Sequence, residues 1–514
     1  MGVPAIDFVL LSMFVRQKKN PSGKISVQVI DKSSGSYKVI KTIGSSSDAA
    51  VVDEMVSEGK SWIERKRGLT PINFSNDIHL AESVLSGIEQ LKQVGLDLLL
   101  GRIFDEVGFK QIGDPYFKYL VLYRLAHPHS KLKTTEYLYR YHGINWHEDQ
   151  LYRYLDKLYN TQTQLVQQIS FTHTEKILGG QISVVFYDVT TLYFEIDQAD
   201  ELRKTGFSKE GKHQNPQIVL GLLVSRNGYP LTYDIFEGNQ FEGRTMLPVI
   251  KAFTDRYKLQ QLIIVADSGL LSKDNVEEFI KDKYQFILGA RIKNESDQVK
   301  KKILALTLSD GKYGIIKKGD LRLIITYSSK RARKDLYNRN RGLERLKKQI
   351  ASGKLTKSNI NKRGYNKYLK MEGSMEVTID QAKFDQDAQW DGLKGYLTNA
   401  ELPESEILEN YQHLWQIEKA FRIAKTDLQI RPIFHRLQRR IEAHICLTFA
   451  AYKVFKELER QLDEKNAGIS PQKAIEIAKS IFEIQVKIPS SQTKVSKTIL
   501  TSDEQKYLAE LFGF

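Results

Sequence analysis

Two aspartates of this chain stand at positions where their side chains are well placed to bind a metal ion. Asp188 lies inside the apolar run VVFYDVTTLYF, and Asp267 ends the apolar run LIIVAD. Both runs predict buried β-strands, and strand alternation places Phe186, Asp188 and Thr190 on one face. Either carboxylate alone is more simply a turn or capping residue, because burying one is costly. Two carboxylates on strands of one sheet, however, offer the oxygen ligands that Mg²⁺ prefers.

A third acid, Glu418, lies in a segment with helical periodicity, YQHLWQIEKAFRIAKTDL. Tyr411, Glu418 and Lys425 are spaced seven residues apart, or two helical turns, so they share one stripe of a helix predicted over residues 404–428. The opposite stripe is small and apolar and is expected to pack on a sheet: Ile417, Ala420, Ile423 and Ala424. Taken alone, this segment is more simply a surface helix with an ion pair between Glu418 and Arg422.

The blocks YDVTTLYFE, ADSGLLS and YQHLWQIEKAFRIAKTDL resemble, in this order, the three catalytic blocks of DDE transposases of prokaryotic insertion sequences, in the IS-four superfamily. The last block is similar to that group's signature Y-x2-R-x3-E-x6-K at Tyr411, Glu418 and Lys425. It departs from the signature at Leu414, where the group has arginine, and Arg422 is the candidate to replace that arginine.

Further segments are similar to the same group, namely residues 206–242, 391–399, 431–452 and FVRQKKNPSGKISVQV near the start. Many members begin at the position of Met13, so the resemblance gives no support to residues 1–12. It covers most of residues 13–460.

The resemblance implies an α/β fold with an RNase H-like, mixed-sheet core, in which Asp188 lies on the central strand, Asp267 on a neighbouring strand and Glu418 on a helix. It implies that these carboxylates bind two Mg²⁺ ions, for which Mn²⁺ can substitute, and catalyse the cleavage and rejoining of phosphodiester bonds in DNA transposition. The implied partners are double-stranded DNA, as terminal inverted repeats and target, and a second copy of the chain in a homodimer. The implied DNA contacts beside the acids are Tyr411, Arg422 and Lys425.

The positive charge of the chain is concentrated in one segment. The 77 Lys and Arg residues exceed the 62 Asp and Glu residues, which gives a net charge of +15. Residues 330–370 hold fifteen of the basic and two of the acidic residues, so this segment alone carries +13. Our main interpretation is phosphate contact, with these residues as candidates: Lys330, Arg331, Arg333 and Lys334. A solvated basic helix and loop, or a nuclear-localisation signal in KRARK, are the other interpretations.

The spacing of the three acids predicts where further domains lie. Asp267 follows Asp188 by 79 residues, whereas Glu418 follows Asp267 by 151, too many for a connecting loop of about 2–6 residues. A domain must interrupt the core there, and the resemblance implies a β-rich one that holds the basic segment. We therefore divide the chain into six segments: a strand meander with a helix (1–75), a helical DNA-binding region (76–178), the first part of the core (179–293), the basic insertion (294–390), the second part of the core (391–462) and a helical tail (463–514).

Composition excludes several classes of protein. The longest apolar runs stop at eight residues, against the ~18 needed to cross a bilayer, and no basic residue precedes the first run as in a signal peptide. The only cysteine, Cys446, allows neither an intramolecular disulfide nor a thiolate zinc site. We expect a cytoplasmic protein that associates with the nucleoid through DNA. Two alternatives stay open: a structure-selective nuclease on the same core, and an inactive transposase relic that only binds DNA.

Overall fold

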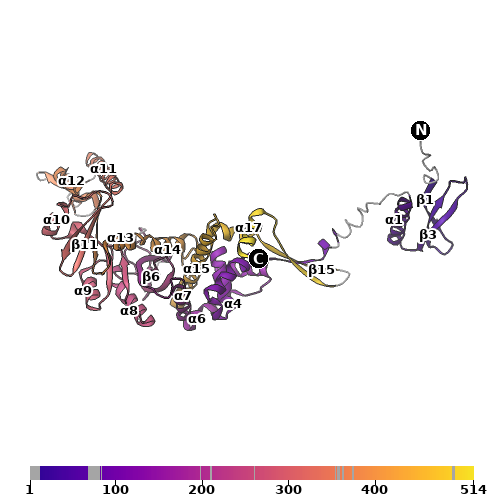
Figure 1. Ribbon diagram of the computed structural model, residues 1–514, viewed down its shortest axis with the longest axis horizontal. Helices are drawn as coiled ribbons and strands as arrows, with labels where there is room; N and C mark the ends of the chain where they lie inside the picture. Colours follow the sequence, from indigo (N-terminus) through magenta and orange to yellow (C-terminus); the bar gives the residue numbers. More distant parts are fainter. Residues whose placement is uncertain are drawn as a thin grey trace. The chain divides into compact units, whose positions relative to one another are not determined.

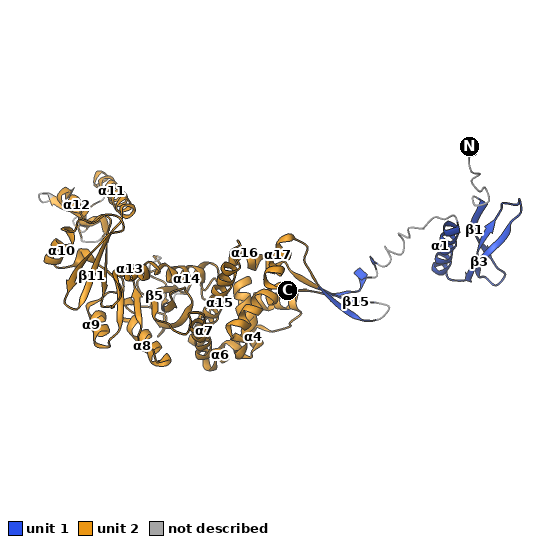
Figure 2. Ribbon diagram, in the orientation of Figure 1, with its two compact units in different colours: residues 1–90, 484–497 blue, residues 91–483, 498–514 orange. Residues whose placement is uncertain are grey.

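The structure is a computed structural model that describes residues 12–66, 81–82, 84–196, 198–208, 211–259, 261–353, 355, 359–361, 364–372, 376–488 and 492–514. The chain forms two compact units, residues 1–90 with 484–497 and residues 91–483 with 498–514 (Figure 2). All three candidate catalytic acids belong to the second unit. The segment limit predicted at residue 75 lies outside the described residues, as do four basic residues of the basic segment: Lys354, Lys357, Lys362 and Arg363.

The first unit contains the strand meander predicted near the N-terminus. Strands β1 (Met13–Lys19), β2 (Ile25–Asp31) and β3 (Lys38–Ser46) pair antiparallel in this order. Helix α1 (Ala49–Lys66) packs on this sheet and is the helix of segment 1–75. Val27 and Val29 of β2, two residues apart, are both buried, as expected for one face of a strand.

A second small sheet corrects two of the predictions. Strand β4 (Ile88–Gln93) lies within a segment expected to be helical, and it pairs with β15 (Phe482–Lys487), which in turn pairs with β16 (Lys494–Ile499). The tail therefore contains a hairpin besides helices α16 (Pro471–Lys479) and α17 (Asp503–Phe512). The partner strand of β4 lies almost 400 residues later in the chain, so local periodicity carries no sign of this pairing.

The predicted helical region forms a layer of helices around α15 (Gln438–Glu464). Asp114 caps α4 and Ser130 caps α5 by accepting hydrogen bonds from backbone N–H groups of the first turn. Helix α15 is buried on nearly every side because the helical layer and the central sheet both pack on it. The helices of this layer are α3 (Arg102–Val107), α4 (Pro115–Ala126), α5 (Lys131–His142), α6 (Glu148–Thr161) and α7 (Thr163–Ile177).

A mixed sheet of eight strands forms the centre of the second unit. Strand β5 runs parallel to β8, and β8 runs parallel to β9, whereas every other neighbouring pair is antiparallel. The strands in spatial order are β10 (Tyr313–Lys318), β11 (Leu321–Tyr327), β14 (Leu393–Thr398), β9 (Gln285–Ala290), β8 (Ile263–Ala266), β5 (Val184–Tyr193), β6 (Gln217–Ser225) and β7 (Pro230–Glu237).

Helices cover both faces of this sheet (Figure 1). Phe186 of β5 faces α13 (Glu404–Gln412), α14 (Trp415–Thr426) and α15, where it shares a hydrophobic core with Ile417. Tyr187, the next residue, faces the opposite side, where α8 (Met246–Tyr257) and α9 (Lys273–Lys281) pack. The sheet is therefore the middle layer of an α/β fold, as the alternation around Asp188 predicted.

The segment between Asp267 and Glu418 differs from the β-rich insertion that we expected. Strands β10 and β11 extend the central sheet instead of forming a separate one. The basic stretch forms the long helix α11 (Ser329–Ala351), which is followed by a two-stranded sheet. The remaining elements of this segment are α10 (Asp297–Leu304), β12 (Leu369–Glu372), β13 (Glu376–Ile379) and α12 (Gln381–Ala388).

Candidate active site

Asp188 and Asp267 lie side by side on neighbouring parallel strands. Tyr187 of β5 is in register with Ala266 of β8, so the residues that follow them, Asp188 and Asp267, are adjacent across the sheet. Neighbouring strands are about 4.8 Å apart, and residues in register across a parallel pair point to the same face. Because Phe186 packs under α14, alternation places both aspartates on the face that α14 covers. Asp188 is half-buried and Asp267 is exposed.

Glu418 reaches this face from α14, although the single helix predicted over residues 404–428 is in fact two helices. A tight turn separates them, in which Leu414 donates its N–H to the Tyr411 carbonyl at 3.1 Å and Ile417 donates to the Leu414 carbonyl at 3.2 Å. Helix α13 packs on β8 and β9, whereas α14 packs on β5 and β6. The break lets the two helices follow the twisted sheet. Ile417 and Ala420 are buried as predicted, and Glu418 is exposed.

Tyr411 connects α13 to the acids. Its side chain is 4% exposed, and its hydroxyl donates a long hydrogen bond, 3.4 Å, to Oδ1 of Asp267. Burial raises the pKa of Tyr411, and the negative charges of Asp267 and Glu418 raise it further. Gly289 leaves the space for this hydroxyl, since a Cβ there would lie 2.5 Å from it. The buried ring is thus placed to orient Asp267 through its hydroxyl.

Lys394 is a functional candidate that sequence reasoning missed. It lies on β14 and is half-buried, with its Nζ 4.4 Å from the centroid of the Tyr411 ring. Burial and the charge of Arg331 lower the pKa of Lys394, whereas Asp267 and Glu418 act to raise it. Asp267 and Glu418 thus both interact electrostatically with the ammonium group of Lys394. A cation at this position can bind a phosphate that lies against the acids.

The three acids do not form a closed metal site. Among the described residues, no three His, Cys, Asp or Glu side chains lie close enough together to hold one ion. The pair Asp188 and Asp267 still offers hard oxygen donors on neighbouring strands, and such ligands suit Mg²⁺, which keeps several waters and takes only one or two carboxylates from a protein. The donor chemistry of the two aspartates therefore fits a divalent metal ion. Glu418 would have to come closer to the aspartates to bind the same ion.

The other predicted DNA contacts near the acids differ in their access to solvent. Leu414, at the arginine position of the signature, is 8% exposed and belongs to the hydrophobic core. Arg422 is exposed one turn beyond Glu418, and no ion pair between these two is found in the described part of the chain. Lys425 lies in the last turn of α14 and is half-buried. Arg422 is thus the predicted contact that solvent reaches most freely.

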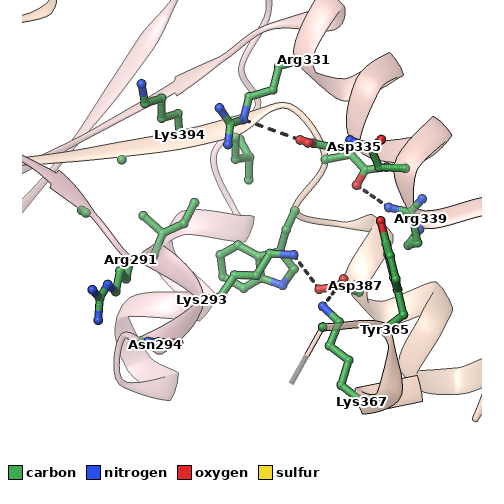
Figure 3. Close-up of a pocket in the computed structure, with 18 of the residues that line it drawn as sticks. Arg291, Lys293, Asn294, Arg331, Asp335, Arg339, Tyr365, Lys367, Asp387 and Lys394 are labelled. Atoms are coloured by element: carbon green, nitrogen blue, oxygen red, sulfur yellow. Dashed lines mark hydrogen bonds and ion pairs between the residues drawn. The ribbon is translucent and has the colours of Figure 1, made fainter. Parts of the chain in front are cut away.

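The basic helix α11 approaches the site at its first turn. The four basic residues predicted to contact phosphate are all exposed there: Lys330, Arg331, Arg333 and Lys334. Of these four, Arg331 lines a cavity of about 520 Å³ that also contains Lys394 (Figure 3). Burial lowers the pKa of Lys394, and the charge of Arg331 lowers it further. One of the four candidates therefore shares a cavity with Lys394, and the other three are exposed on the same helix.

The rest of this cavity is close to electrically neutral. Asp387 accepts hydrogen bonds from Lys293 at 2.6 Å and from Lys367 at 2.8 Å. Arg339 pairs with Asp391 (Figure 3). On the other side, Arg291 donates to the carbonyl of Gly269 at 3.1 Å, two residues beyond Asp267. Arg331 pairs with Asp335 at 3.6 Å, so Arg291 and Lys394 are the cations of this cavity for which no carboxylate partner is found among the described residues.

A comparison of the sequence with known protein families decides the family. Residues 179–453, more than half of the chain, match the family described as transposase DDE domain. The chain belongs to this family of DDE transposases. The matched range of the transposase includes Asp188, Asp267 and Glu418, together with Lys394. A transposase acts on DNA, so the family assigns phosphodiester cleavage and transfer to this chain.

Two further comparisons add little to this assignment. No protein of curated function matches the chain in sequence. Among solved structures, the transposase is similar to the piggyBac transposase in a cryo-EM structure of its synaptic complex with hairpin DNA, at 10% identity and a TM-score of 0.38, over 75% of this chain and 76% of that one. Within its described residues, no helix is both long and apolar enough to cross a membrane.

Proposed function

We propose that this transposase cleaves DNA at the ends of an insertion sequence of the IS-four superfamily and joins those ends to target DNA, on an RNase H-like core. The observation that carries the proposal is the adjacency of Asp188 and Asp267 on the face that α14 and Glu418 cover. The strand order β7-β6-β5-β8-β9 supports an RNase H-like core, because three antiparallel strands are followed by two strands parallel to β5.

In this proposal Asp188, Asp267 and Glu418 hold two Mg²⁺ ions, with DNA and water supplying the other ligands. Bound Mg²⁺ would provide Lewis-acid stabilisation of charge on the phosphate and would lower the pKa of a bound water. Water oxygen attacks phosphorus, the P–O3′ bond breaks, and the 3′-oxygen leaves as a hydroxyl. In strand transfer that 3′-hydroxyl attacks a phosphodiester of the target and displaces another 3′-hydroxyl.

The other side chains of the site position these reactants. Lys394 and Arg422 bind phosphate oxygens on either side of the acids, and Tyr411 holds Asp267 through its hydroxyl. Because two ends must be cut, we propose that two copies of the chain act together as a homodimer on double-stranded DNA, in the cytoplasm and at the nucleoid.

The test compares three variants with the unchanged chain on a duplex that carries an end of the element. Asp188→Asn, Asp267→Asn and Glu418→Gln should each abolish Mg²⁺-dependent or Mn²⁺-dependent strand cleavage, whereas binding of the end stays within about twofold, because the folded surface is retained. Tyr411→Phe is the matched control, since it removes only the hydroxyl and should leave reduced but measurable cleavage. Cleavage by any of the three variants at the normal rate would remove that acid from the site.

A strand-transfer assay separates a transposase from a nuclease on the same core. A pre-cleaved end with a free 3′-hydroxyl is incubated with supercoiled target DNA and Mg²⁺. The proposal requires covalent joining that is lost in Asp188→Asn. Cleavage without joining would favour the structure-selective nuclease, and binding with neither reaction would favour an inactive relic.

A further inference from the structure

A second charged cavity lies in the second unit, on the helical layer instead of beside the acids. It has a volume of about 240 Å³ and lies between α4, the start of α5 and the segment 429–435 that links α14 to α15. This is below the range of about 300–1,000 Å³ typical of pockets for drug-sized ligands, so it suits a small anion. Its basic lining residues are Arg124, His129, Lys131, Arg431, His435 and His444, and no Asp or Glu is among the lining residues that the structure describes.

Lys131 is the most unusual residue of this cavity. Its side chain is 5% exposed, and its ammonium group makes no hydrogen bond or ion pair within the described part of the chain. Burial lowers the pKa of Lys131 well below its ordinary value, and the charge of Arg124 lowers it further, with no carboxylate to raise it. An unpaired buried cation is costly, so a role in packing alone does not explain a lysine here.

Arg124 adds a second buried cation, for which no carboxylate partner is found within the described ranges of the chain. Its side chain is 6% exposed, and its guanidinium donates to the Leu428 carbonyl at 3.5 Å and to Nδ1 of His444 at 3.4 Å. His444 in turn donates from Nε2 to the Ile430 carbonyl at 3.0 Å, so this histidine is neutral. These partners fix the orientation of Arg124 and leave its charge uncompensated.

The backbone adds to the positive potential and connects the cavity to the catalytic sheet. Lys131 is the first residue of α5, so the positive end of the α5 dipole lies in the same wall. Across the cavity, the guanidinium of Arg431 lies 5.6 Å from the ring centroid of Tyr193, at the end of β5. Strand β5 also carries Asp188, so one strand runs from the candidate acids to Tyr193 beside this cavity.

We infer that the cavity between α4, α5 and segment 429–435 binds a phosphate group through Lys131 and Arg124. The phosphate comes either from the DNA backbone or from a free anion, since both present the same oxygens to these donors. Two buried cations that converge without an acid, next to a helix N-terminus, are the chemistry that binds such a group. The inference does not depend on strand cleavage, because phosphate binding can be measured without it.

The first experiment measures thermal unfolding of the full chain in sodium phosphate and in sodium chloride of equal ionic strength. We expect phosphate to raise the melting temperature by about 1–2 °C at roughly ten times its dissociation constant. Lys131→Met should melt higher than the unchanged chain in chloride, because an unpaired buried charge is removed, and it should gain nothing from phosphate. Lys133→Met is the matched control on the same helix, since Lys133 is exposed and pairs with Glu136 at 2.5 Å, and it should keep the phosphate effect.

The second experiment identifies the source of the phosphate from the salt dependence of duplex DNA binding. If the DNA backbone occupies the cavity, Lys131→Met should reduce the slope of log affinity against log salt by about one, and Lys131→Arg should restore it. A lost phosphate effect with an unchanged slope assigns the site to a free anion. The inference is overturned if phosphate stabilises the unchanged chain no more than chloride does, or if Lys131→Met melts lower in chloride, which would give Lys131 a structural role.

Discussion

Helix α11 and the cavity at the start of α5 are both positively charged, but their charges are balanced in different ways. In α11, Arg339 pairs with Asp391, Lys347 pairs with Glu344, and the residues of the first turn are exposed to water. In the cavity, Lys131 and Arg124 are buried and have no carboxylate partner in the described structure. A count of charges in the sequence identifies helix α11. Only the cavity at the start of α5, however, holds buried cations whose burial lowers the stability of the fold. This cost in stability indicates that a ligand binds there.

The largest effect that tests this comparison of paired and unpaired cations is expected at Arg339, the buried and paired cation of the basic segment. Arg339→Met leaves Asp391 with a half-buried and unpaired charge, so we expect the free energy of unfolding to fall by about 3–5 kcal/mol. Chemical denaturation of the full chain measures this loss. The double variant Arg339→Met with Asp391→Leu should recover most of it, and a neutral single variant would show that the pair adds nothing.

Lys394 is intermediate between a buried, paired cation such as Arg339 and a buried, unpaired one such as Lys131. It is half-buried and lies near acids that we assign to catalysis. Lys394→Met should slow strand cleavage by roughly a hundredfold, since a cation that faces the reacting phosphate is removed. Lys394→Arg should retain part of the rate. Rates measured with saturating DNA separate this effect from binding, and an unchanged rate would return Lys394 to a structural role beside Tyr411.

The exposed charges at the start of α11 should have a smaller effect, on DNA affinity alone. Reversal of four charges to Glu, at Lys330, Arg331, Arg333 and Lys334, should weaken duplex binding at least about tenfold and flatten its salt dependence. Thermal stability should change little, because these side chains are exposed. An unchanged salt slope, measured by titration at several salt concentrations, would assign the segment to hydrated surface.

The smallest expected effect is the pH dependence that the second cavity gives to stability. Burial lowers the pKa of His435 to about 3, and the charges of Lys131, Arg124 and Arg440 contribute. Between its ordinary pKa of about 6.5 and that value, the unfolded chain binds a proton that the folded chain does not, so stability falls as pH falls. Between pH 6.5 and 5, above the range of most carboxylates, His435→Gln should lose about 2 °C less in melting temperature than the unchanged chain.

Phosphate sharpens this last prediction. An anion in the cavity favours the protonated form of His435, so the difference between His435→Gln and the unchanged chain should shrink when phosphate replaces chloride. A difference that is the same in both salts would show that the anion does not reach His435.

Much of the candidate site follows from local patterns. The run around Asp188 alternates with a period of two, which predicted its strand and its face, and the small apolar stripe with Ile417 and Ala420 predicted the packing of α14 on a sheet. Lys394 carried a weaker signal that we did not use, a lysine on the same face of an apolar strand as Tyr396. The break at Leu414 carried none, because the sheet under α13 and α14 imposes it.

By itself, the sequence of this transposase determined which residues share a face of a strand or helix, since the direction of a side chain repeats over two to four residues. Only the tertiary structure decided which distant segments meet. It paired β4 with β15 in place of a helix, added β10 and β11 to the central sheet, and brought Asp391 to Arg339. It also left Lys131 without a hydrogen-bond or ion-pair partner among the residues that the structure describes. The physical reason is that pairing and desolvation are set by neighbours in space, and those neighbours are fixed only when the whole chain packs.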